Sequence, residues 1–301
     1  MKFRFWGVRG SIPSPGPRTV RYGGNTTCIE VRGDDGTLVV LDAGTGIHVL
    51  AQDLMRRRAE DGAPVRANIF ITHSHWDHIH GLPFFTPLFV KGTRVCLHGA
   101  HDHVTGRGIE HVMAVQLQNS YFPVSEERMD AAIDYRTLDV GVPHAVGDMV
   151  VHNVVMNHPV INLGYRVECN GRAVFFTGDH EPFFNPHAPG STEYDAAQRD
   201  IERREREIEH AMEGIDALIA DCSYTLEEYP AKQGWGHGTF DAAIALALRV
   251  GARSLYCTHH EPTRSDDELE AVFAEALARW AGRLDGLAVN LAYEGLEVEL
   301  R

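Results

Sequence analysis

The stretch Thr72-His-Ser-His-Trp-Asp-His78 places three imidazoles and one carboxylate in the six residues from 73 to 78. It directly follows an apolar run, 67–71, that is typical of a buried strand. Imidazole and carboxylate are preferred ligands of zinc and similar divalent ions, and a loop after a rigid strand can turn alternate side chains toward one point. We therefore interpret this stretch as the centre of a metal site. The alternative interpretation is a histidine-rich loop that binds metal only adventitiously.

Alternation along the loop lets neighbouring side chains serve different ions, His73 and His75 one ion and Asp77 and His78 another. A loop of this size cannot complete a site for two ions, so further ligands are expected at the ends of later strands. They are present in the sequence. Taken singly, each could be a capping or hydrogen-bonding residue, but their recurrence at strand ends favours metal ligation. The later candidates are His158, after the predicted strand 149–155, Asp179, after 174–178, and His259, after 255–258.

Together with the turn Asp42-Ala-Gly-Thr-Gly46, these residues resemble the metallo-β-lactamase superfamily over nearly the whole chain. The resemblance implies a four-layer αββα sandwich of the α/β class. The aspartate and histidine at positions 77 and 78 imply a hydrolase and not the oxygen-reducing di-iron branch, which has a glutamate in place of the second histidine. The resemblance also implies two ligand sets that share a bridging Asp179. These are His73, His75, His158 and Asp179 for one ion, and Asp77, His78, Asp179 and His259 for the other.

Three further motifs resemble the branch of ribonuclease Z and cyclic-nucleotide phosphodiesterases. They are Gly24-Asn-Thr-Thr27, Asn157-His158 with Gly164-Tyr165 downstream, and Gly236-His-Gly-Thr239. The chain has no evident long Gly/Pro-rich arm of the kind that grips tRNA. Its 28 Lys and Arg against 42 Asp and Glu give a net charge of −14, which opposes attraction of a polyanion. We therefore expect a small-molecule phosphodiester, such as a cyclic nucleotide, rather than a large RNA.

Apolar periodicity and turn residues predict a β-rich first half and a second half in which helices and strands alternate. This order favours two packed sheets with helices outside, formed by one domain over residues 1–301, with the metal site at the shared edge where strands end. The turn signal Gly33-Asp-Asp-Gly36 predicts a hairpin between the second and third strands. Strands are expected at 2–6, 26–31, 37–41, 67–71, 94–97, 149–155, 163–169, 173–176, 217–219 and 254–257, and helices from 47 and over 193–212, 240–250 and 266–281.

Two residues outside the ligand sets have distinct expected roles. Asp42 lies on a glycine-rich turn, where its carboxylate could hydrogen-bond a ligand imidazole or contact the following helix N-terminus. His237 lies between glycines that permit close approach to a substrate, and we predict that it is a general acid. Its alternative role is to cap the helix at Phe240. Asp77 and His237 are the predicted catalytic residues.

Several residues close to the predicted ligands have less specific signals. Asp221 and Tyr224 close another strand and could support His237 or the substrate. His180 and His260 each follow a predicted ligand directly, and a chain cannot turn every side chain inward. We therefore expect both histidines to lie beside the metal site or on the surface.

Composition excludes several classes of protein. With 44% hydrophobic and 23% charged residues the chain has the balance of a globular protein, and it contains no apolar run of the roughly 18 residues needed to span a membrane. Its start lacks the features of a signal peptide. Five widely spaced cysteines with no C-x-x-C pattern indicate reduced thiols and a cytoplasmic location. The resemblance further suggests a homodimer.

The expected cofactors are two divalent metal ions, Zn²⁺ first, with Mn²⁺ or Fe as alternatives. Two such ions can activate a water and neutralise phosphoryl oxygens, so the principal hypothesis is phosphodiester hydrolysis. Two other hypotheses stay open. One is metal-dependent hydrolysis of a lactone, thioester or β-lactam, and the other is a non-catalytic metal-binding sensory or scaffold protein.

Overall fold

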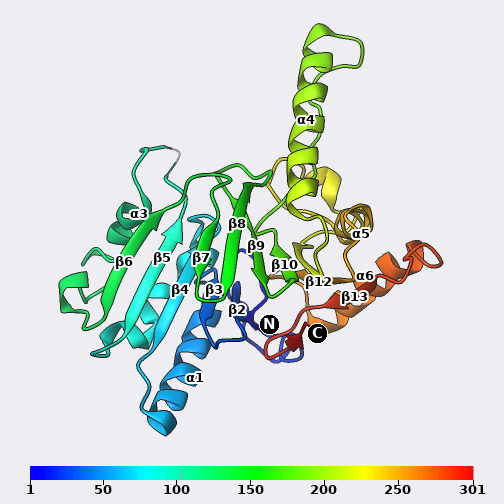
Figure 1. Ribbon diagram of the computed structural model, residues 1–301. Helices are drawn as coiled ribbons and strands as arrows, with labels where there is room; N and C mark the ends of the chain where they lie inside the picture. The colour runs from blue at the N-terminus through cyan, green and yellow to red at the C-terminus, as the bar shows by residue number, and fades with distance from the viewer. Residues whose placement is uncertain (103, 301) are drawn as a thin grey trace.

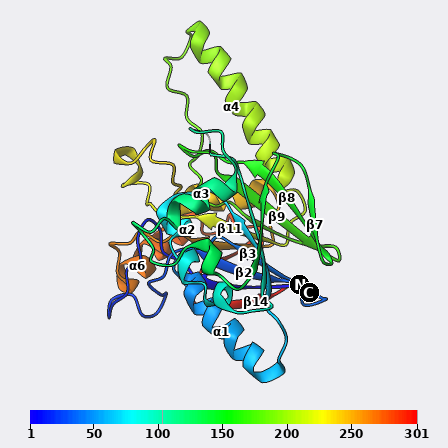
Figure 2. The same cartoon turned by 90° about the vertical axis from the view of Figure 1, so that its left-hand side faces the viewer.

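The computed structural model describes residues 1–102 and 104–300. Two mixed β-sheets lie face to face, and helices cover their outer faces (Figure 1). Turning the molecule shows the termini side by side at the edge formed by β14 (Glu297–Glu299) (Figure 2). The four-layer α/β sandwich predicted from the sequence is therefore confirmed. In the described part of the chain, no helix is long and apolar enough to cross a membrane.

The first sheet has the order β14-β1-β2-β3-β4-β5-β6. β2 and β3 form the predicted antiparallel hairpin, and β3 to β6 run parallel. The amide of Gly36 donates to the carbonyl of Gly33 within the hairpin turn, where Gly36 has a φ of 84° that a glycine adopts without steric cost. The strands are β1 (Lys2–Gly7), β2 (Cys28–Arg32), β3 (Leu38–Leu41), β4 (Arg66–Ile71), β5 (Arg94–Gly99) and β6 (Ala132–Thr137), with β14 at the edge.

The second sheet has the order β13-β12-β11-β10-β9-β8-β7. β10 to β13 run parallel, while β9 is antiparallel to both β8 and β10. β8 therefore runs in the same direction as β10, and their carboxyl ends lie at the same edge. The strands are β7 (His144–Val146), β8 (Met149–Val155), β9 (Leu163–Cys169), β10 (Arg172–Phe176), β11 (Ala217–Asp221), β12 (Ser254–Thr258) and β13 (Ala288–Leu291).

Alternating side chains from both sheets form the core between them. In β9, for example, Leu163, Tyr165 and Val167 are buried and point to the same side, as the two-residue period of a strand requires. Phe70 of β4 and Phe176 of β10 belong to the same cluster. Separate apolar clusters fix the helices to the outer face of each sheet. This packing holds rigid the strands that end at the predicted metal site.

The four helices predicted from the sequence are present, with boundaries within two residues of those expected, whereas α2 and α3 were not predicted. Thr239 caps α5 by accepting a hydrogen bond from the amide of Ala242, and Ser265 and Glu268 form a capping box at α6. α4, which confirms the helix predicted over 193–212, projects away from the body (Figure 1), and Ile208 is its only buried residue. The helices are α1 (Gly46–Asp61), α2 (Trp76–Ile79), α3 (Ile109–Gln116), α4 (Thr192–Ala211), α5 (Phe240–Arg249) and α6 (Asp266–Arg279), with 3₁₀ turns at Leu82–Phe84, Thr86–Phe89, Glu126–Arg128 and Tyr229–Ala231.

Some elements were not predicted from the sequence. β6 and β14 are edge or near-edge strands with mostly exposed residues, and β7 has only three residues, so their apolar pattern is weak. The predicted strands at 26–31 and 37–41 begin later, at Cys28 and Leu38. These differences concern edges and boundaries, where tertiary pairing rather than local sequence decides the outcome.

Candidate metal centre

Strand direction brings the predicted ligands to one edge of the sandwich. The histidine motif follows β4 in the first sheet, while His158 follows β8, Asp179 follows β10 and His259 follows β12 in the second. All seven predicted ligand residues converge there. Their donor atoms form two groups that share Asp179, and within each group the atoms lie within 4.8 Å of one another. The groups are His73, His75, His158 and Asp179, and Asp77, His78, Asp179 and His259.

The first group surrounds oxygen Oδ2 of Asp179. The Nε2 atom of His73 lies 3.5 Å from this oxygen, and Nε2 of His158 lies 4.0 Å from it. His75 completes the group, with its Nδ1 atom 3.1 Å from Nε2 of His158. Three imidazole nitrogens and one carboxylate oxygen thus face a common point, which is a donor set suited to zinc.

The second group surrounds the other oxygen, Oδ1, of Asp179. Nε2 of His78 and Nε2 of His259 each lie 3.2 Å from it. Oδ2 of Asp77 lies 3.1 Å from His259 and 3.3 Å from His78. Because the two oxygens of Asp179 face different groups, its carboxylate has the geometry of a bridge between two ions.

Unsatisfied buried atoms test whether metal ions fit this arrangement. Among the described residues, Nε2 of His73, Nε2 of His78 and Oδ1 of Asp179 are buried without a hydrogen-bond partner. Buried polar atoms almost always have a partner, so three such atoms at one place need an explanation. All three point into the two donor groups. The chemistry and burial of the residues present therefore fit divalent ions.

Asp42 orients the histidine motif from behind. Its carboxylate accepts hydrogen bonds from the amide and hydroxyl of Thr72, at 2.7 and 2.9 Å, and pairs with Nδ1 of His78 at 2.7 Å. This contact leaves Nε2 of His78 directed at the second donor group. The structure thus favours the predicted contact with a ligand imidazole over a contact with the helix N-terminus, where α1 has Thr45 at its N-cap position.

The second sheet orients its histidines in the same way. Nδ1 of His158 donates to the carbonyl of Gly236 at 2.9 Å. Nδ1 of His259 lies 2.9 Å from the hydroxyl of Ser223, and that hydroxyl is 2.7 Å from Asp221. Each contact occupies the ring nitrogen that faces away from the centre, so Nε2 of each histidine is left for a metal.

His237 lies beside the donor groups. Its Nδ1 atom pairs with Oδ2 of Asp221 at 2.9 Å, and its ring stacks on His259 with centroids 4.7 Å apart. Nε2 of His237 has no hydrogen-bond partner among the described residues, and 13% of the side chain is exposed. Since Thr239 caps α5, the alternative capping role of His237 is wrong. The predicted support of His237 by Asp221 is present.

The carboxylates and histidines of the centre shift one another's pKa values. Burial alone would lower the pKa of His259, but the charges of Asp179, Asp221 and Asp77 outweigh it and raise the pKa to about 9. Burial also opposes protonation of His237, yet Asp221 and Asp179 raise its pKa above the usual value. These shifts reflect concentrated negative charge that attracts either protons or metal cations.

His73 behaves in the opposite way. Burial, assisted by the neighbouring His78, lowers the pKa of His73 well below its usual value. Burial and nearby histidines likewise lower the pKa values of His75 and His158, although Asp179 opposes the shift. The first donor group therefore presents neutral imidazoles, the form that binds metal.

Comparison with known proteins shows the family to which the chain belongs. A model of the family described as "Beta-lactamase superfamily domain" matches residues 37–260, which contain all seven residues of the two donor groups. The chain belongs to this family. The resemblance drawn from the sequence motifs is thereby confirmed at the level of the superfamily.

Relatives of this beta-lactamase superfamily chain match it over most of their length. Ribonuclease Z from Bacillus thuringiensis (strain Al Hakam) is 24% identical over 92% of this chain and 94% of its own. The metallo-beta-lactamase fold protein YhfI from Bacillus subtilis superposes with a TM-score of 0.65, 19% identity and 99% coverage of both chains. Yeast PDE1 superposes with a TM-score of 0.67, 15% identity and 99% coverage of both. These likenesses confirm the metallo-β-lactamase fold.

Glu181 is a buried residue near the metal centre that was not predicted from the sequence. Its carboxylate accepts hydrogen bonds from the hydroxyl of Tyr229 and the amides of Gly234 and Gly236, at 2.8, 2.7 and 2.8 Å. It therefore fixes the loop whose carbonyl at Gly236 orients His158. No local signal identifies it, because its partners lie 48 to 55 residues away in sequence.

A second missed contact comes from the N-terminal loop. The amide of Ser11 donates to Oδ2 of Asp77 at 2.7 Å. Ser11 has a φ of 60°, an uncommon conformation for a residue with a side chain, and this conformation accompanies the contact with Asp77. A serine far ahead of the motif carries no sequence pattern that would reveal this role.

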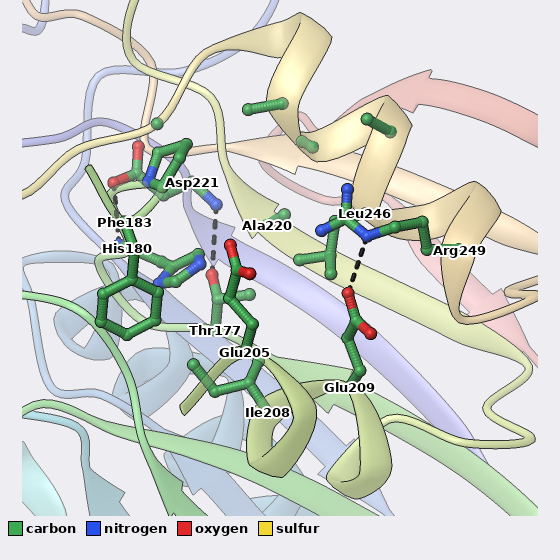
Figure 3. A pocket seen from close by; sticks show the side chains of 15 residues that line it. Thr177, His180, Phe183, Glu205, Ile208, Glu209, Ala220, Asp221, Leu246 and Arg249 are labelled. Carbon is green, nitrogen blue, oxygen red and sulfur yellow. Dashed lines mark hydrogen bonds and ion pairs between the residues drawn. The ribbon is translucent and has the colours of Figure 1, made fainter. Parts of the chain in front are cut away.

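A small cavity of about 150 Å³ lies next to Asp221, at the base of α4 (Figure 3). Figure 3 shows His180 and Asp221 at one end and the ion pair between Glu209 and Arg249 at the other. Burial lowers the pKa of His180 to about 4. None of the seven donor residues lines this cavity, so it lies behind the metal centre. His180 lies beside the centre, as expected.

His260 is fully buried, and its Nε2 atom donates to the carbonyl of Ala292 at 2.8 Å. Burial lowers its pKa to about 3. It is therefore neither a ligand nor a surface residue, but part of the packing behind His259. Tyr224 places its ring 5.9 Å from that of His237, close enough to flank it.

Proposed function

We propose that this chain is a metal-dependent hydrolase that cleaves phosphodiesters with two divalent ions, Zn²⁺ in the first place. The observation that carries the proposal is the carboxylate of Asp179, whose two oxygens face two separate groups of imidazole and carboxylate donors. Ions bound there would supply an activated water and neutralise charge on the phosphoryl oxygens. His237 also belongs to a third possible donor group, with Asp179, Asp221 and His259, but its Nδ1 atom pairs with Asp221, so we assign it to proton transfer and not to metal binding.

The chain's own residues would divide the work as follows. The seven donors would hold the ions, and Asp77, one of these donors, is also a proposed catalytic residue. Asp221 holds Nδ1 of His237, so the free Nε2 atom is positioned to give its proton to the departing alkoxide oxygen. His237 thus moves a proton and binds no metal.

Two observations support a small phosphodiester as the substrate. The relatives include a ribonuclease, an enzyme class whose substrate backbone is a phosphodiester. The net charge of −14 opposes binding of a long polyanion, which favours a small molecule such as a cyclic nucleotide over RNA. We further propose that the two packed sheets form one domain over 1–301. None of the five cysteines is in a disulfide, which supports a cytoplasmic location.

A substrate panel tests this proposal. Metal-loaded protein is incubated with bis-p-nitrophenyl phosphate, a cyclic nucleotide, a lactone and nitrocefin, before and after treatment with a chelator. We expect turnover of the two phosphodiesters that disappears on chelation and returns when Zn²⁺ is added. Turnover of only the lactone or nitrocefin would replace the proposal with carbonyl hydrolysis. Full metal occupancy without turnover of any substrate would indicate a sensory or scaffold protein.

A further inference from the structure

The inner face of the first sheet is partly uncovered at its β5 and β6 edge. In Figure 1 these strands extend beyond β7, the edge strand of the second sheet. Strand register places Phe70, His98 and Arg136 in one row across β4, β5 and β6. Phe70 packs in the core between the sheets, so its neighbours His98 and Arg136 share that inward face. Beyond β7, this face borders a cavity instead of the second sheet.

The cavity has a volume of about 620 Å³ and is lined by residues of β4 to β6, the end of α1 and the turn after β7. Such a volume is typical of sites for small organic molecules. Arginines outnumber acids among the lining residues, although the protein as a whole carries a net charge of −14. The charged residues are Arg32, Arg57, Arg58, Arg66 and Arg136 against Asp35, Asp61 and Asp134.

Three of these arginines have no acidic partner in the described structure, and one of them, Arg58, donates to the carbonyl of Lys91 instead. Arg32 and Arg57 form ion pairs with Glu30 and Asp53, respectively. Within residues 1–102 and 104–300, by contrast, neither Arg66 nor Arg136 forms an ion pair with a carboxylate. Two unpaired guanidinium groups beside one cavity are complementary to an anion, since each presents a planar set of N–H donors that matches phosphate or carboxylate oxygens.

His98 provides an independent indication of a ligand. It is only 2% exposed, yet both of its ring nitrogens are buried without a hydrogen-bond partner in the described structure. Its ring stacks on Phe70, with centroids 4.1 Å apart and planes 3° from parallel, so its orientation is fixed. His98 lines the cavity beside Arg136. A neutral imidazole has one N–H donor and one acceptor nitrogen. A ligand in the cavity would give the ring nitrogens of His98 the hydrogen-bond partner that they lack within the protein.

We propose that this cavity is a binding site for a phosphorylated small molecule that also carries hydroxyl groups, separate from the metal centre. Arg66 and Arg136 would bind the phosphoryl oxygens, and His98 would donate a hydrogen bond to the same group. Asp134, which is the neighbour of Cys96 in the adjacent row, would accept hydrogen bonds from hydroxyls. Arg66 lies at the start of β4, whereas the row of Phe70, His98 and Arg136 lies near the carboxyl ends of β4 to β6. The cavity therefore extends along the inner face of these strands, and none of the seven donor residues of the metal centre lines it.

Calorimetric titration of the metal-loaded protein with ribose 5-phosphate tests the proposal. Because a phosphate can also bind at the metal centre, the test compares variants. We expect Arg66→Gln and Arg136→Gln each to weaken one binding event by about 10- to 100-fold, as for the loss of a charged hydrogen bond. Metal content and the hydrolytic rate should stay unchanged in both. His98→Phe retains the stacking on Phe70 and should also weaken binding. Ring-¹⁵N-labelled histidine should report a shifted His98 signal in the wild type.

Arg94→Gln is the matched control. Arg94 pairs with Arg66 in the strand register but does not line the cavity, so its loss should leave binding unchanged. Ribose without phosphate should not bind. The proposal is overturned if ribose 5-phosphate does not bind the wild type at millimolar concentration. It is also overturned if Arg94→Gln weakens binding as much as Arg66→Gln, or if succinate binds and ribose 5-phosphate does not.

Discussion

At the scale of single residues, Asp179 differs from every other donor because both groups depend on it. His75 and His158 belong to the first group only. Replacing either by alanine should therefore leave the donors of the second group intact and lower bound metal toward one ion per chain. Asp179→Ala should lower the metal content further and abolish turnover. Elemental analysis of the purified variants measures the difference.

His80 offers a matched control for that experiment. It is an exposed histidine only two positions after His78, and it belongs to neither donor group. His80→Ala should keep the metal content and rate of the wild type. Two fully occupied ions in Asp179→Ala would rule out the bridging role.

His237 is expected to affect chemistry and not metal content. His237→Ala should keep both ions and lose about 10²- to 10⁴-fold in kcat on a substrate with an alkoxide leaving group. p-Nitrophenolate leaves without a proton, so the loss on bis-p-nitrophenyl phosphate should be much smaller. Measuring kcat on a cyclic nucleotide and on bis-p-nitrophenyl phosphate in parallel tests whether His237 donates a proton to the leaving group. Equal losses on both would indicate that His237 positions the substrate, and loss of an ion would make it a ligand.

His98 makes stability depend on pH. Burial, with Arg136 and His144 nearby, lowers the pKa of His98 from 6.5 to about 4. Between these values the unfolded chain binds a proton that the folded chain does not, so stability falls as pH decreases from about 6.5 to about 4 and then levels off. The effect of this one residue is up to about 3 kcal/mol.

Urea unfolding at pH 7 and pH 4.5 measures that dependence for the wild type and His98→Phe. The phenylalanine keeps the stacking on Phe70 but cannot titrate, so the variant should lose less stability on acidification. Protonation elsewhere in the molecule affects both proteins equally and cancels in the difference. Identical losses in the two proteins would contradict the assignment.

At the scale of elements, sequence alone predicted the strands that carry the centre and missed those at the edges. β4 ends in the apolar residues 69–71, and the motif after it is dense in metal-binding side chains, so local sequence was sufficient. β6 and β14 depend on partners far away in the chain, and their exposed residues show little alternation. The same limit applies to Glu181 and Ser11, whose contacts exist only after folding.

The loop held by Glu181 is an element whose stability can be measured. Glu181→Ala should leave the amides of Gly234 and Gly236 without a partner and destabilise the fold by about 1–3 kcal/mol. It should also weaken metal binding at the first group, because the carbonyl of Gly236 orients His158. Urea unfolding and metal titration measure the two effects. Tyr229→Phe removes one of the three hydrogen bonds to Glu181, so it should lower the free energy of unfolding and the metal affinity less than Glu181→Ala does. Equal losses in the two variants would show that Glu181 does not stabilise the loop through the amides of Gly234 and Gly236.

At the scale of the whole molecule, the centre joins the two sheets. The histidine motif follows a strand of the first sheet, while His158, Asp179 and His259 follow strands of the second. Ions bound between them should therefore stabilise the sandwich and not only the loops. With free metal at about 1,000 times its Kd, removal should cost about 4 kcal/mol and lower Tm by about 6 °C.

Calorimetry with and without a chelator measures this shift. Zn²⁺ added back should restore Tm, whereas Asp179→Ala should respond little to either treatment. If chelation leaves Tm of the wild type unchanged, the ions do not link the sheets.

The adjacency of the two chain ends has a consequence for biosynthesis. β1 pairs with β14, and the side chains of Lys2 and Glu297, which are 295 residues apart in sequence, are hydrogen-bonded across this pair. While the ribosome is still translating the middle of the message, the outer edge of β1 has no strand to pair with. A nascent chain thus exposes an open, β-rich edge from the synthesis of β1 until that of β14, and an open edge of this kind can pair with other chains.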